Sequence, residues 1–409
     1  MPTTYADCHS DENDSTSAVP FHPSEIFFSR TDERGKIIAG NTVFQRVSQY
    51  PWGELLAKPH NVIRHPDMPR GVFWLLWDRI KCGKLTGAYV KNRAKDGRHY
   101  WVFAIVAPAE RGFLSVRIKP TSSIFRIVQK EYAGLLTLEA DQALKPAASA
   151  ALLTERIRAL GFDDYDAFMA DALTAEMIAR SRLTRGIDDS LLECFRVLME
   201  RARALIAMSA LISSSYTSHQ FVPLNLLVQA DRLGQAGAAI GTISANYRLL
   251  ADEIKAGLDE FIKAAAGVAA NICQGAFMVG TANVQREAIR AFAKETPFAE
   301  VDHYREMASL QSQETAYELA VQKILIGIRG DVERFHHQTQ DLKRLASGLS
   351  AIRVMGKVES GRLAVPVLAD LIADLEAFQG VIASGLAEIG SVNQALRQNV
   401  EALANIGRN

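Results

Sequence analysis

Residues 59–101 read PHNVIRHPDMPRGVFWLLWDRIKCGKLTGAYVKNRAKDGRHYW, and this stretch decides the fold of the N-terminal part of the chain. Pro69 suits the start of a helix, where a missing N–H is tolerated. Four apolar residues then recur at the spacing of one helix face: Phe73, Leu76, Trp77 and Ile80. Asp96-Gly97 is a hairpin-turn signal because both central residues of such a turn need positive φ. The stretch therefore predicts a polar loop, an amphipathic helix and a β-hairpin.

The sequence on either side extends this pattern into a small α+β domain. Strands are expected at Ile26–Thr31 and Lys36–Gly40, with short helices through Leu56. A final three-strand meander ends before Pro120. An antiparallel sheet with helices on one face leaves a pocket between the two layers, where such domains hold a ligand.

Several segments between Ile26 and Thr121 resemble the PAS domain of the aerotaxis-receptor (Aer) type. The matching segments are FFSRTDERGKII, Asn41-x-x-Phe44, VSQYPWGELLAKPHN, RHPDMP, VKNRAKDGRHYWV and LSVRIKPT. The resemblance implies an α+β PAS sensor domain at 25–121, with an antiparallel sheet and flanking helices, that binds FAD. A pocket that holds haem or a small metabolite, or that is empty, stays open as the alternative.

The resemblance also implies which residues belong to the flavin pocket. Carried over by position, they are Asn41, Arg64, His65, Asp67 and Asn92. A cationic rim suits phosphates or ring carbonyls, and an Asn offers both donor and acceptor to the ring edge. Many relatives carry a Trp where this chain has Thr86, so an aromatic that would flank the flavin is missing. The residues alone also permit a surface ion pair of Arg64 with Asp67, His65 as a helix cap, and Asn92 on a solvent-facing strand.

The composition excludes several function classes. Lys+Arg and Asp+Glu both total 46, so there is no net field to attract nucleic acid. The four cysteines form no metal or disulfide spacing, which fits a reducing cytoplasm. The uncharged run 264–285 contains Asn and Gln and is too polar for a comfortable membrane span. No residue pair is poised for covalent or acid–base turnover, so we expect neither an enzyme nor a metal site.

The remaining sequence suggests three further regions. Residues 1–24 are rich in Ser, Thr and Asp and predict a disordered tail. Residues 122–186 predict a helical linker region, with a turn and helix start at Gly161–Asp164. Residues 187–409 predict an all-α hairpin or bundle, because apolar residues recur there by alternating threes and fours.

One run with this heptad spacing, called a seam below, consists of Leu191, Phe195, Leu198, Ala202, Leu205, Ser209, Ile212 and Tyr216. Another begins at Ile240 and Ile243, beyond a glycine-flanked turn near 234–239. Two helices joined at such a turn make an antiparallel hairpin. Pro223 lacks an N–H and predicts a kink in the first helix near His219.

The turn region, LNLLVQADRLGQAGAAIGTISANYRLLA at 224–251, is similar to the hairpin tip of methyl-accepting chemotaxis proteins. The tip residues carried over are Asn225, Gln229, Arg232, Gly234, Gly237 and Arg248. The resemblance implies binding of a chemotaxis histidine kinase and its coupling protein. Two family glutamates are replaced here, by Gln229 and Asn246, so a generic helical hairpin is the alternative. Residues 352–362 faintly echo the same pattern, and a second hairpin or a simple helical turn both remain open there.

Together these observations favour a cytoplasmic sensory protein. Its PAS domain would sense redox or oxygen state through flavin and relay that state to a receptor-like helical module. PAS domains and heptad hairpins commonly associate in pairs, so a homodimer is expected. A dimerising or regulatory scaffold is the alternative class.

Overall fold

The computed structural model describes residues 18–187, 189–219 and 221–406. Most of the predicted disordered tail, residues 1–17, lies outside the described residues. Residues 18–24 are packed, contrary to the prediction. Phe21 is 7% exposed and meets the ring of Phe27 edge-on at 5.1 Å between centroids. Apolar contact with the first strand therefore orders the chain ahead of the predicted domain boundary.

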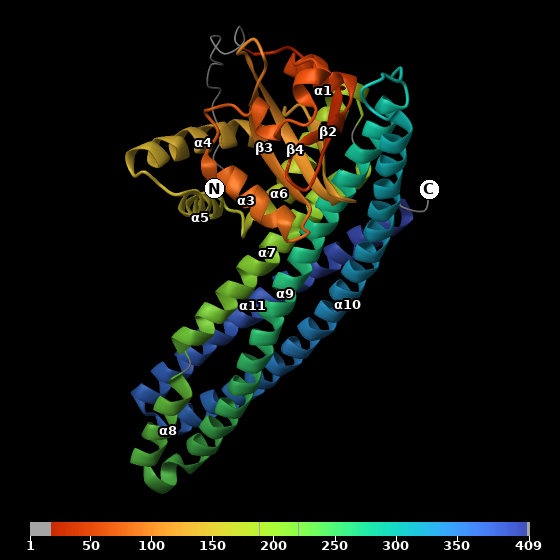
Figure 1. The fold of residues 1–409 in the computed structure, drawn as a ribbon. Coiled ribbons are helices and arrows are strands. Elements are labelled where there is room, and N and C mark those ends of the chain that lie inside the picture. Colours follow the sequence, from red (N-terminus) through yellow and green to blue (C-terminus); the bar gives the residue numbers. More distant parts are fainter. Residues whose placement is uncertain (1–17, 188, 220, 407–409) are drawn as a thin grey trace. The chain divides into compact units, whose positions relative to one another are not determined.

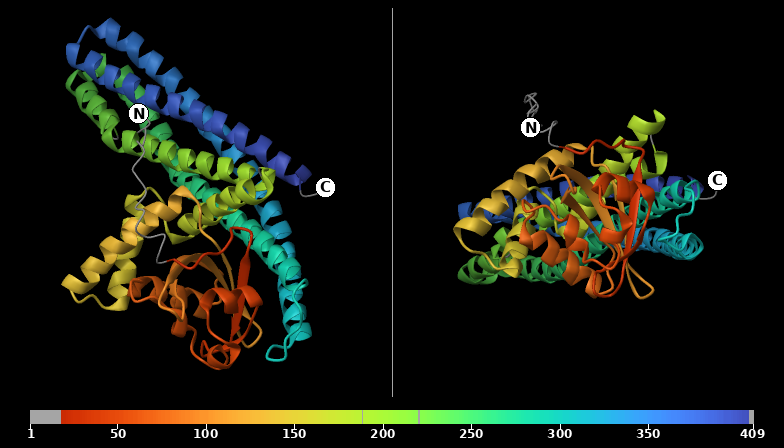
Figure 2. Two further views of the ribbon diagram at one scale, coloured as in Figure 1. Left: turned by 90° about the horizontal axis from the view of Figure 1, so that it is seen from above. Right: turned by 45° about the horizontal axis from the view of Figure 1, so that its top comes forward.

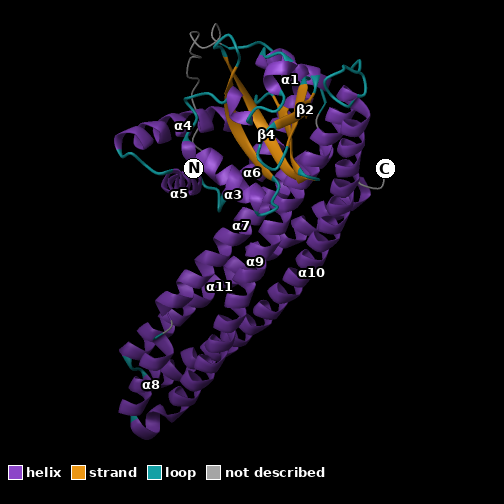
Figure 3. Cartoon of the chain, viewed as in Figure 1, coloured by secondary structure: helices purple, strands orange, loops and turns teal. Residues whose placement is uncertain are grey.

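The N-terminal domain contains a five-stranded antiparallel sheet with strand order β2-β1-β5-β4-β3 (Figures 1 and 3). The last three strands form the predicted meander, and β5 returns to pair with β1. The strands are β1 (Ile26–Thr31), β2 (Ile37–Gly40), β3 (Thr86–Arg93), β4 (His99–Ala109) and β5 (Gly112–Ile118). All strands predicted from the sequence are present.

One face of this sheet is covered by short helices and by α3. Leu76 and Ile80 of α3 are buried, and its Phe73 and Trp77 are half-buried, so the predicted helix face does point inward. The turn between β3 and β4 differs in detail from the prediction: Gly97 has φ of 93°, whereas Asp96 does not have positive φ. The helices are α1 (Thr42–Ser48), α2 (Trp52–Leu55), η1 (His60–Ile63) and α3 (Arg70–Lys81).

Three helices follow the sheet, as predicted for the region after residue 122. They are α4 (Ser123–Asp141), α5 (Pro146–Ala159) and α6 (Tyr165–Arg185). Ser122 and Asp164 begin α4 and α6 by accepting hydrogen bonds from backbone N–H groups three residues on. The pattern Gly161–Asp164 does mark a turn, with Gly161 at φ of 95°.

The chain divides into two compact units, and the division differs from the predicted domain boundaries. Unit 1 is Met1–Glu193 with Ala276–Val321, and unit 2 is Cys194–Gly275 with Gln322–Asn409. The helices α9 (Ala238–Phe292) and α10 (His303–Leu363) therefore each contribute residues to both units. Residues 276–321 group with the N-terminal domain because of contacts with segments more than two hundred residues earlier, such as the ring pair Phe28–Phe292 at 4.8 Å.

Unit 2 is a bundle of long antiparallel helices, which lie side by side in Figures 1 and 2. Besides its parts of α9 and α10, it contains most of α7 (Ser190–His219), together with α8 (Val222–Arg232) and α11 (Pro366–Ile406). Phe261 of α9 packs on Phe335 of α10 at 4.5 Å, and Tyr216 of α7 meets Phe378 of α11 at 6.0 Å. Most residues of the predicted seams are buried. Two hairpins of one chain thus supply the bundle core.

The turn between α8 and α9 lies where the glycine pattern places it. Gly234 has φ of 56°, a conformation that favours glycine. A Cβ on Gly237 would collide with the carbonyl group of Ala230, so the close turn requires a glycine there too. The kink predicted from Pro223 is in fact a division into two helices, since α7 ends at His219 and α8 begins at Val222. A second hairpin joins α10 to α11 directly after residues 352–362, where Ala364 has positive φ.

One segment among the described residues, Gly234–Phe292, is long and apolar enough to cross a membrane by length and composition. Of its most apolar window, 44% is buried inside the protein. Core helices of bundles pass the same test, and this helix includes the run 264–285, which is too polar for a comfortable membrane span.

Candidate functional site

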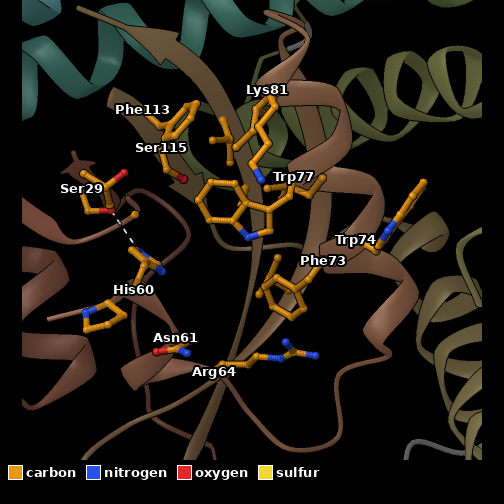
Figure 4. Close-up of a pocket in the computed structure, with 18 of the residues that line it drawn as sticks. Ser29, His60, Asn61, Arg64, Phe73, Trp74, Trp77, Lys81, Phe113 and Ser115 are labelled. Atoms are coloured by element: carbon orange, nitrogen blue, oxygen red, sulfur yellow. Dashed lines mark hydrogen bonds between the residues drawn. The ribbon is translucent and has the colours of Figure 1, made fainter. Parts of the chain in front are cut away.

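A cavity of about 830 Å³ lies between α3 and the sheet (Figure 4). The face of α3 predicted to be apolar forms one wall, because Phe73, Leu76, Trp77 and Ile80 all line the cavity. Trp77 meets Phe113 of β5 edge-on at 5.5 Å between ring centroids. The cavity is therefore large enough for a drug-sized ligand and offers aromatic surface to a planar ring.

The cavity lining is strongly cationic. Its only carboxylate among the described residues is Asp78, whereas five basic side chains line it: Arg34, Arg64, Arg70, Lys81 and Arg117. Arg34, Arg70 and Lys81 are exposed and form a rim, whereas Arg117 is buried. Arg64 is half-buried, and its guanidinium lies over the ring of Phe73 at 4.0 Å. Such a lining suits a ligand that carries negative charge.

The sheet supplies a buried polar floor. Asn92 of β3, and Ser115 and Arg117 of β5, are 3%, 7% and 3% exposed and all line the cavity. Each has a buried polar atom with no hydrogen-bond partner in the described part of the chain: Asn92 Nδ2, Ser115 Oγ and Arg117 Nη1. Buried polar groups are normally hydrogen-bonded. Three such orphaned atoms in the lining of one cavity are what a polar ligand would satisfy.

His60 of η1 borders this floor as a neutral ring. Its Nε2 accepts a hydrogen bond from Arg117 Nη2 at 2.6 Å and lies 3.2 Å from Ser29 Oγ. Burial, and then the neighbouring Arg117 charge, lower the pKa of His60 well below its usual value. Figure 4 shows Ser29, His60 and Ser115 on one side of the cavity and Trp74 on the other.

Two of the five predicted pocket residues, Arg64 and Asn92, line the cavity. The other three do not. Asn41 is buried beneath α1, where its Oδ1 accepts from the backbone N–H groups of Phe28 and Phe44 at 3.1 and 3.2 Å. Its Nδ2 donates to the carbonyl of Ile26 at 2.9 Å, so the side chain is fully used in capping α1 and tying it to β1. Its predicted contact with a ligand is corrected to a structural role.

His65 and Asp67 lie outside the cavity lining. His65 Nδ1 accepts from the Asp67 backbone N–H at 3.1 Å, and the Asp67 carboxylate pairs with Lys91 Nζ at 3.2 Å. Burial and the Lys91 charge lower the pKa of His65. The alternative of an ion pair between Asp67 and Arg64 is not seen either, since Arg64 donates to the carbonyl of Met68 at 3.3 Å.

Thr86, which stands where an aromatic was expected, does not line the cavity. Its hydroxyl donates to the carbonyl of Lys84 at 3.2 Å. Aromatic surface comes instead from Phe73, Trp74 and Trp77 of α3. The cavity therefore keeps aromatic side chains although Thr86 replaces the Trp of many relatives. Three lining residues, Arg117, Ser115 and His60, were not predicted from the sequence, although polar residues at alternate positions of a strand such as LSVRI do mark one face.

The opposite face of the sheet carries a second polar cluster around Glu176 of α6. Its Oε1 accepts from Tyr89 Oη at 2.8 Å and Ser122 Oγ at 2.6 Å. Its Oε2 accepts from the backbone N–H groups of Thr121 and Ser122 at 2.5 and 3.0 Å. Burial raises the pKa of Glu176, and these donors oppose that shift. The carboxylate joins β3, the N-terminus of α4 and α6.

No protein-family model matches the chain. Over 122 residues the chain is 37% identical to the aerotaxis receptor of Escherichia coli (strain K12). That match covers 29% of this chain and 24% of the receptor, so the chain spans about a quarter of the length of its curated relative. The N-terminal domain is a PAS domain of the aerotaxis-receptor type. The expected α+β sheet domain followed by an all-α region is confirmed.

Among solved structures, the chain is similar to the LOV domain of a blue-light activated histidine kinase from Erythrobacter litoralis. The identity is 13%, the match covers 22% of this chain and 90% of that chain, and the TM-score is 0.21. A PAS domain from Colwellia psychrerythraea is 19% identical, with 24% and 86% covered and a TM-score of 0.21. At these values neither structure bears on what this PAS domain binds.

The cavity residues fit the flavin that the aerotaxis-receptor resemblance implies. The orphaned donors at Asn92, Ser115 and Arg117 can meet ring carbonyls or phosphate oxygens, and the aromatic wall at Trp77 can lie against a planar ring. The cationic rim can meet phosphates. The likeness to a sensory receptor and the large lined cavity support a role in sensory signal transduction.

Proposed function

We propose that this chain is a cytoplasmic redox or oxygen sensor whose PAS cavity binds FAD and whose helices relay the state of that cavity. The observation that carries the proposal is the meeting of three orphaned buried donors with a cationic rim and an aromatic wall in one cavity. A bound flavin supplies a ring whose charge and hydrogen bonding change with its redox state. The chain's own residues orient that ring and respond to it.

The polar residues that line the cavity are positioned both to orient a flavin ring and to respond to a change in it. Asn92 would hold the ring edge through its unpaired Nδ2, and Arg64 and the rim cations would hold phosphate oxygens. Ser115 and Arg117 belong to β5, whose alternate residues Leu114 and Val116 point to the opposite face of the sheet. A change in hydrogen bonding at the floor can therefore shift a strand that other elements contact.

The opposite face contacts the helices that continue into unit 2. Leu114 and Val116 line a small cavity together with Gln285 of α9 and Tyr317 of α10. Gln313 of α10 donates to the carbonyl of Pro108 in β4 at 3.1 Å. These contacts lie within unit 1, and α9 and α10 both extend into unit 2 along the chain. They support a relay in which the sheet biases the packing of these two helices.

We further propose that the tip of the helical bundle is the output. Asn225, Arg232 and Arg248 are exposed there, and Gln229 is half-exposed. The resemblance of this tip to chemotaxis receptors makes a chemotaxis histidine kinase and its coupling protein the proposed partners, with a homodimer as the proposed assembly. Binding of the purified kinase to the purified chain tests the proposed partner. The molar mass of the chain from sedimentation equilibrium tests the proposed homodimer.

The deciding experiment is an absorbance spectrum of the purified full-length protein, with the released cofactor identified after heat denaturation. Flavin bands at near-stoichiometric occupancy support the proposal. A Soret band would replace it with haem sensing. A protein that stays colourless after incubation with FAD would leave a dimerising or regulatory scaffold.

The variant Asn92→Ala tests the assigned floor. It removes one unpaired donor at a cavity wall, so flavin should be lost while the far-UV circular dichroism is unchanged. An Asn92→Ala protein that purifies with full flavin content would count against the proposed role of Asn92. A steady-state oxidase or reductase assay tests the accompanying proposal that the chain is not an enzyme.

A further inference from the structure

Arg117 is a buried cation that no carboxylate of the described residues neutralises. Its side chain forms no ion pair with Asp or Glu among the described residues, and its Nη1 has no hydrogen-bond partner. The neighbours that it does contact are neutral: Nη2 donates to Ser29 Oγ at 3.0 Å and to His60 Nε2 at 2.6 Å. Burial lowers the pKa of Arg117 to about 10, so the guanidinium remains charged at neutral pH.

The other buried arginines of the described chain show that this is an exception. Arg30 and Arg180 are 7% and 2% exposed, and each pairs with a glutamate, Glu306 and Glu287 respectively. An isolated charge buried away from water costs several kcal/mol unless it is paired. In this chain a buried guanidinium without a carboxylate therefore stands out, and it stands in the lining of the cavity.

The groups around Arg117 complete a small donor set. Ser115 lies two residues earlier on the same strand face, lines the cavity and has a buried, unpartnered Oγ. The neutral His60 ring uses its Nε2 to accept from Arg117, which leaves the Arg117 Nη1 donors and the Ser115 hydroxyl free. Two donors and one full positive charge, all buried, match an anionic oxygen group better than a neutral amide or an apolar ring.

We infer that Arg117, Ser115 and His60 form an anion subsite at the floor of the PAS cavity, which binds an acidic oxygen group of the ligand. This inference rests on the proposal that the cavity holds a ligand, but not on that ligand being FAD. The acidic oxygens can belong to FAD or to a small carboxylate or phosphate compound. The subsite fixes which part of the ligand faces β5.

The test compares Arg117→Met with Arg93→Met in the full-length chain. Arg93 is exposed at the end of β3 and does not line the cavity, so it is the matched loss of one charge. FAD affinity is measured by quenching of flavin fluorescence. We expect Arg117→Met to raise the Kd for FAD at least tenfold and Arg93→Met to change it less than threefold. Equal effects of the two variants would overturn the subsite.

A second readout is the melting temperature of the ligand-free protein. If Arg117 is held for a ligand, removing its unpaired charge should leave the melting temperature unchanged or raise it. Ser29 Oγ still lies 3.2 Å from His60 Nε2, so this pair keeps a hydrogen-bond partner. A lower melting temperature for Arg117→Met would show a structural role and overturn the inference.

The third readout separates the subsite from the FAD proposal. Inorganic phosphate and malonate are titrated against ligand-free wild type and Arg117→Met in thermal melts. Stabilisation of the wild type alone, with no binding of FAD, would sustain the subsite and overturn FAD as the ligand. No binding of FAD, phosphate or malonate by the wild type would overturn both.

Discussion

Arg30 of β1 forms a buried, two-pronged ion pair with Glu306 of α10, with Arg30 Nε donating to Glu306 Oε2 at 2.7 Å and Nη2 to Oε1. The Arg30 and Glu306 side chains are only 9% and 4% exposed. The neighbours of Arg30 along β1, Ser29 and Thr31, both line the cavity. One strand thus contacts the ligand cavity with one face and holds a helix of unit 1 with the other.

The first prediction concerns the energy of this pair. Arg30→Met should destabilise the PAS domain by ~3–5 kcal/mol, because it leaves the Glu306 charge buried and unpaired. The double variant Arg30→Met, Glu306→Leu should recover most of that loss. Urea unfolding followed by tryptophan fluorescence measures it, since all four tryptophans lie in the PAS domain, at 52, 74, 77 and 101. Single and double variants of equal stability would show that the pair is not desolvated.

A second prediction follows from the four donors around Glu176. Both carboxylate oxygens of Glu176 now accept hydrogen bonds. In Glu176→Gln an NH₂ group replaces one of these oxygens, so the donors that bonded to it are left buried and unpaired. We expect a loss of about 1–3 kcal/mol in unfolding free energy. Tyr89→Phe is the milder control: Glu176 Oε1 keeps Ser122 as a donor, so the loss should be about 1 kcal/mol. A greater loss in Tyr89→Phe than in Glu176→Gln would contradict this ranking.

The third prediction is a pH dependence. Burial and Arg117 hold the pKa of His60 well below its usual 6.5, so the folded state keeps this ring neutral while the unfolded state takes up a proton. The unfolded state therefore binds more protons below pH ~6.5, and the contribution to stability, complete above that pH, is lost as the pH falls. The slope reaches about 1.4 kcal/mol per pH unit at most.

Urea unfolding at pH 7.5, 6.5 and 5.5 checks this, with His60→Gln as the comparison. The wild type should lose stability from pH 6.5 to 5.5 faster than His60→Gln does. His65, whose pKa is also lowered, titrates in both proteins and cancels in the difference. Parallel curves for the two proteins would mean that His60 is protonated equally in the folded and unfolded states.

The local pattern of the sequence was sufficient for much of this fold. Strand β1, the inward face of α3, the break at Pro223 and the turn at Gly234 each depend on residues a few positions apart. Periodicity, proline geometry and glycine φ act over that range. Arg64 and Asn92, which do line the cavity, were instead carried over from the aerotaxis-receptor resemblance.

Contacts between residues far apart in the chain could not be predicted from local sequence patterns. Arg30 and Glu306 are 276 residues apart, and the sequence around either residue does not identify the other as its partner. For the same reason the sequence assigned residues 276–321 to the helical bundle, whereas they pack with the PAS domain. Asn41 was carried over by position from the resemblance, which does not show whether an Asn side chain meets a ligand or caps a helix, and here it caps α1.

The last prediction concerns the close approach of α5 to α3. A Cβ on Gly71 would lie 2.6 Å from the backbone nitrogen of Ala150 and closer still to Ser149 Oγ. Gly71→Ala must therefore push α5 away, at a cost of about 1–3 kcal/mol. Pro146, the first residue of α5, lines the cavity, so the shift should also loosen ligand binding there.

Gly53→Ala in α2 is the matched control, since nothing lies within 4 Å of its added Cβ. Alanine is the better helix former, so this variant should be neutral or stabilising by up to about 1 kcal/mol. The melting temperature and the FAD Kd of both variants check the pair. Gly71→Ala should lower the first and raise the second, because steric separation of α3 and α5 acts on both. A Gly71→Ala protein as stable as Gly53→Ala would mean that α5 is not held against α3 at this contact.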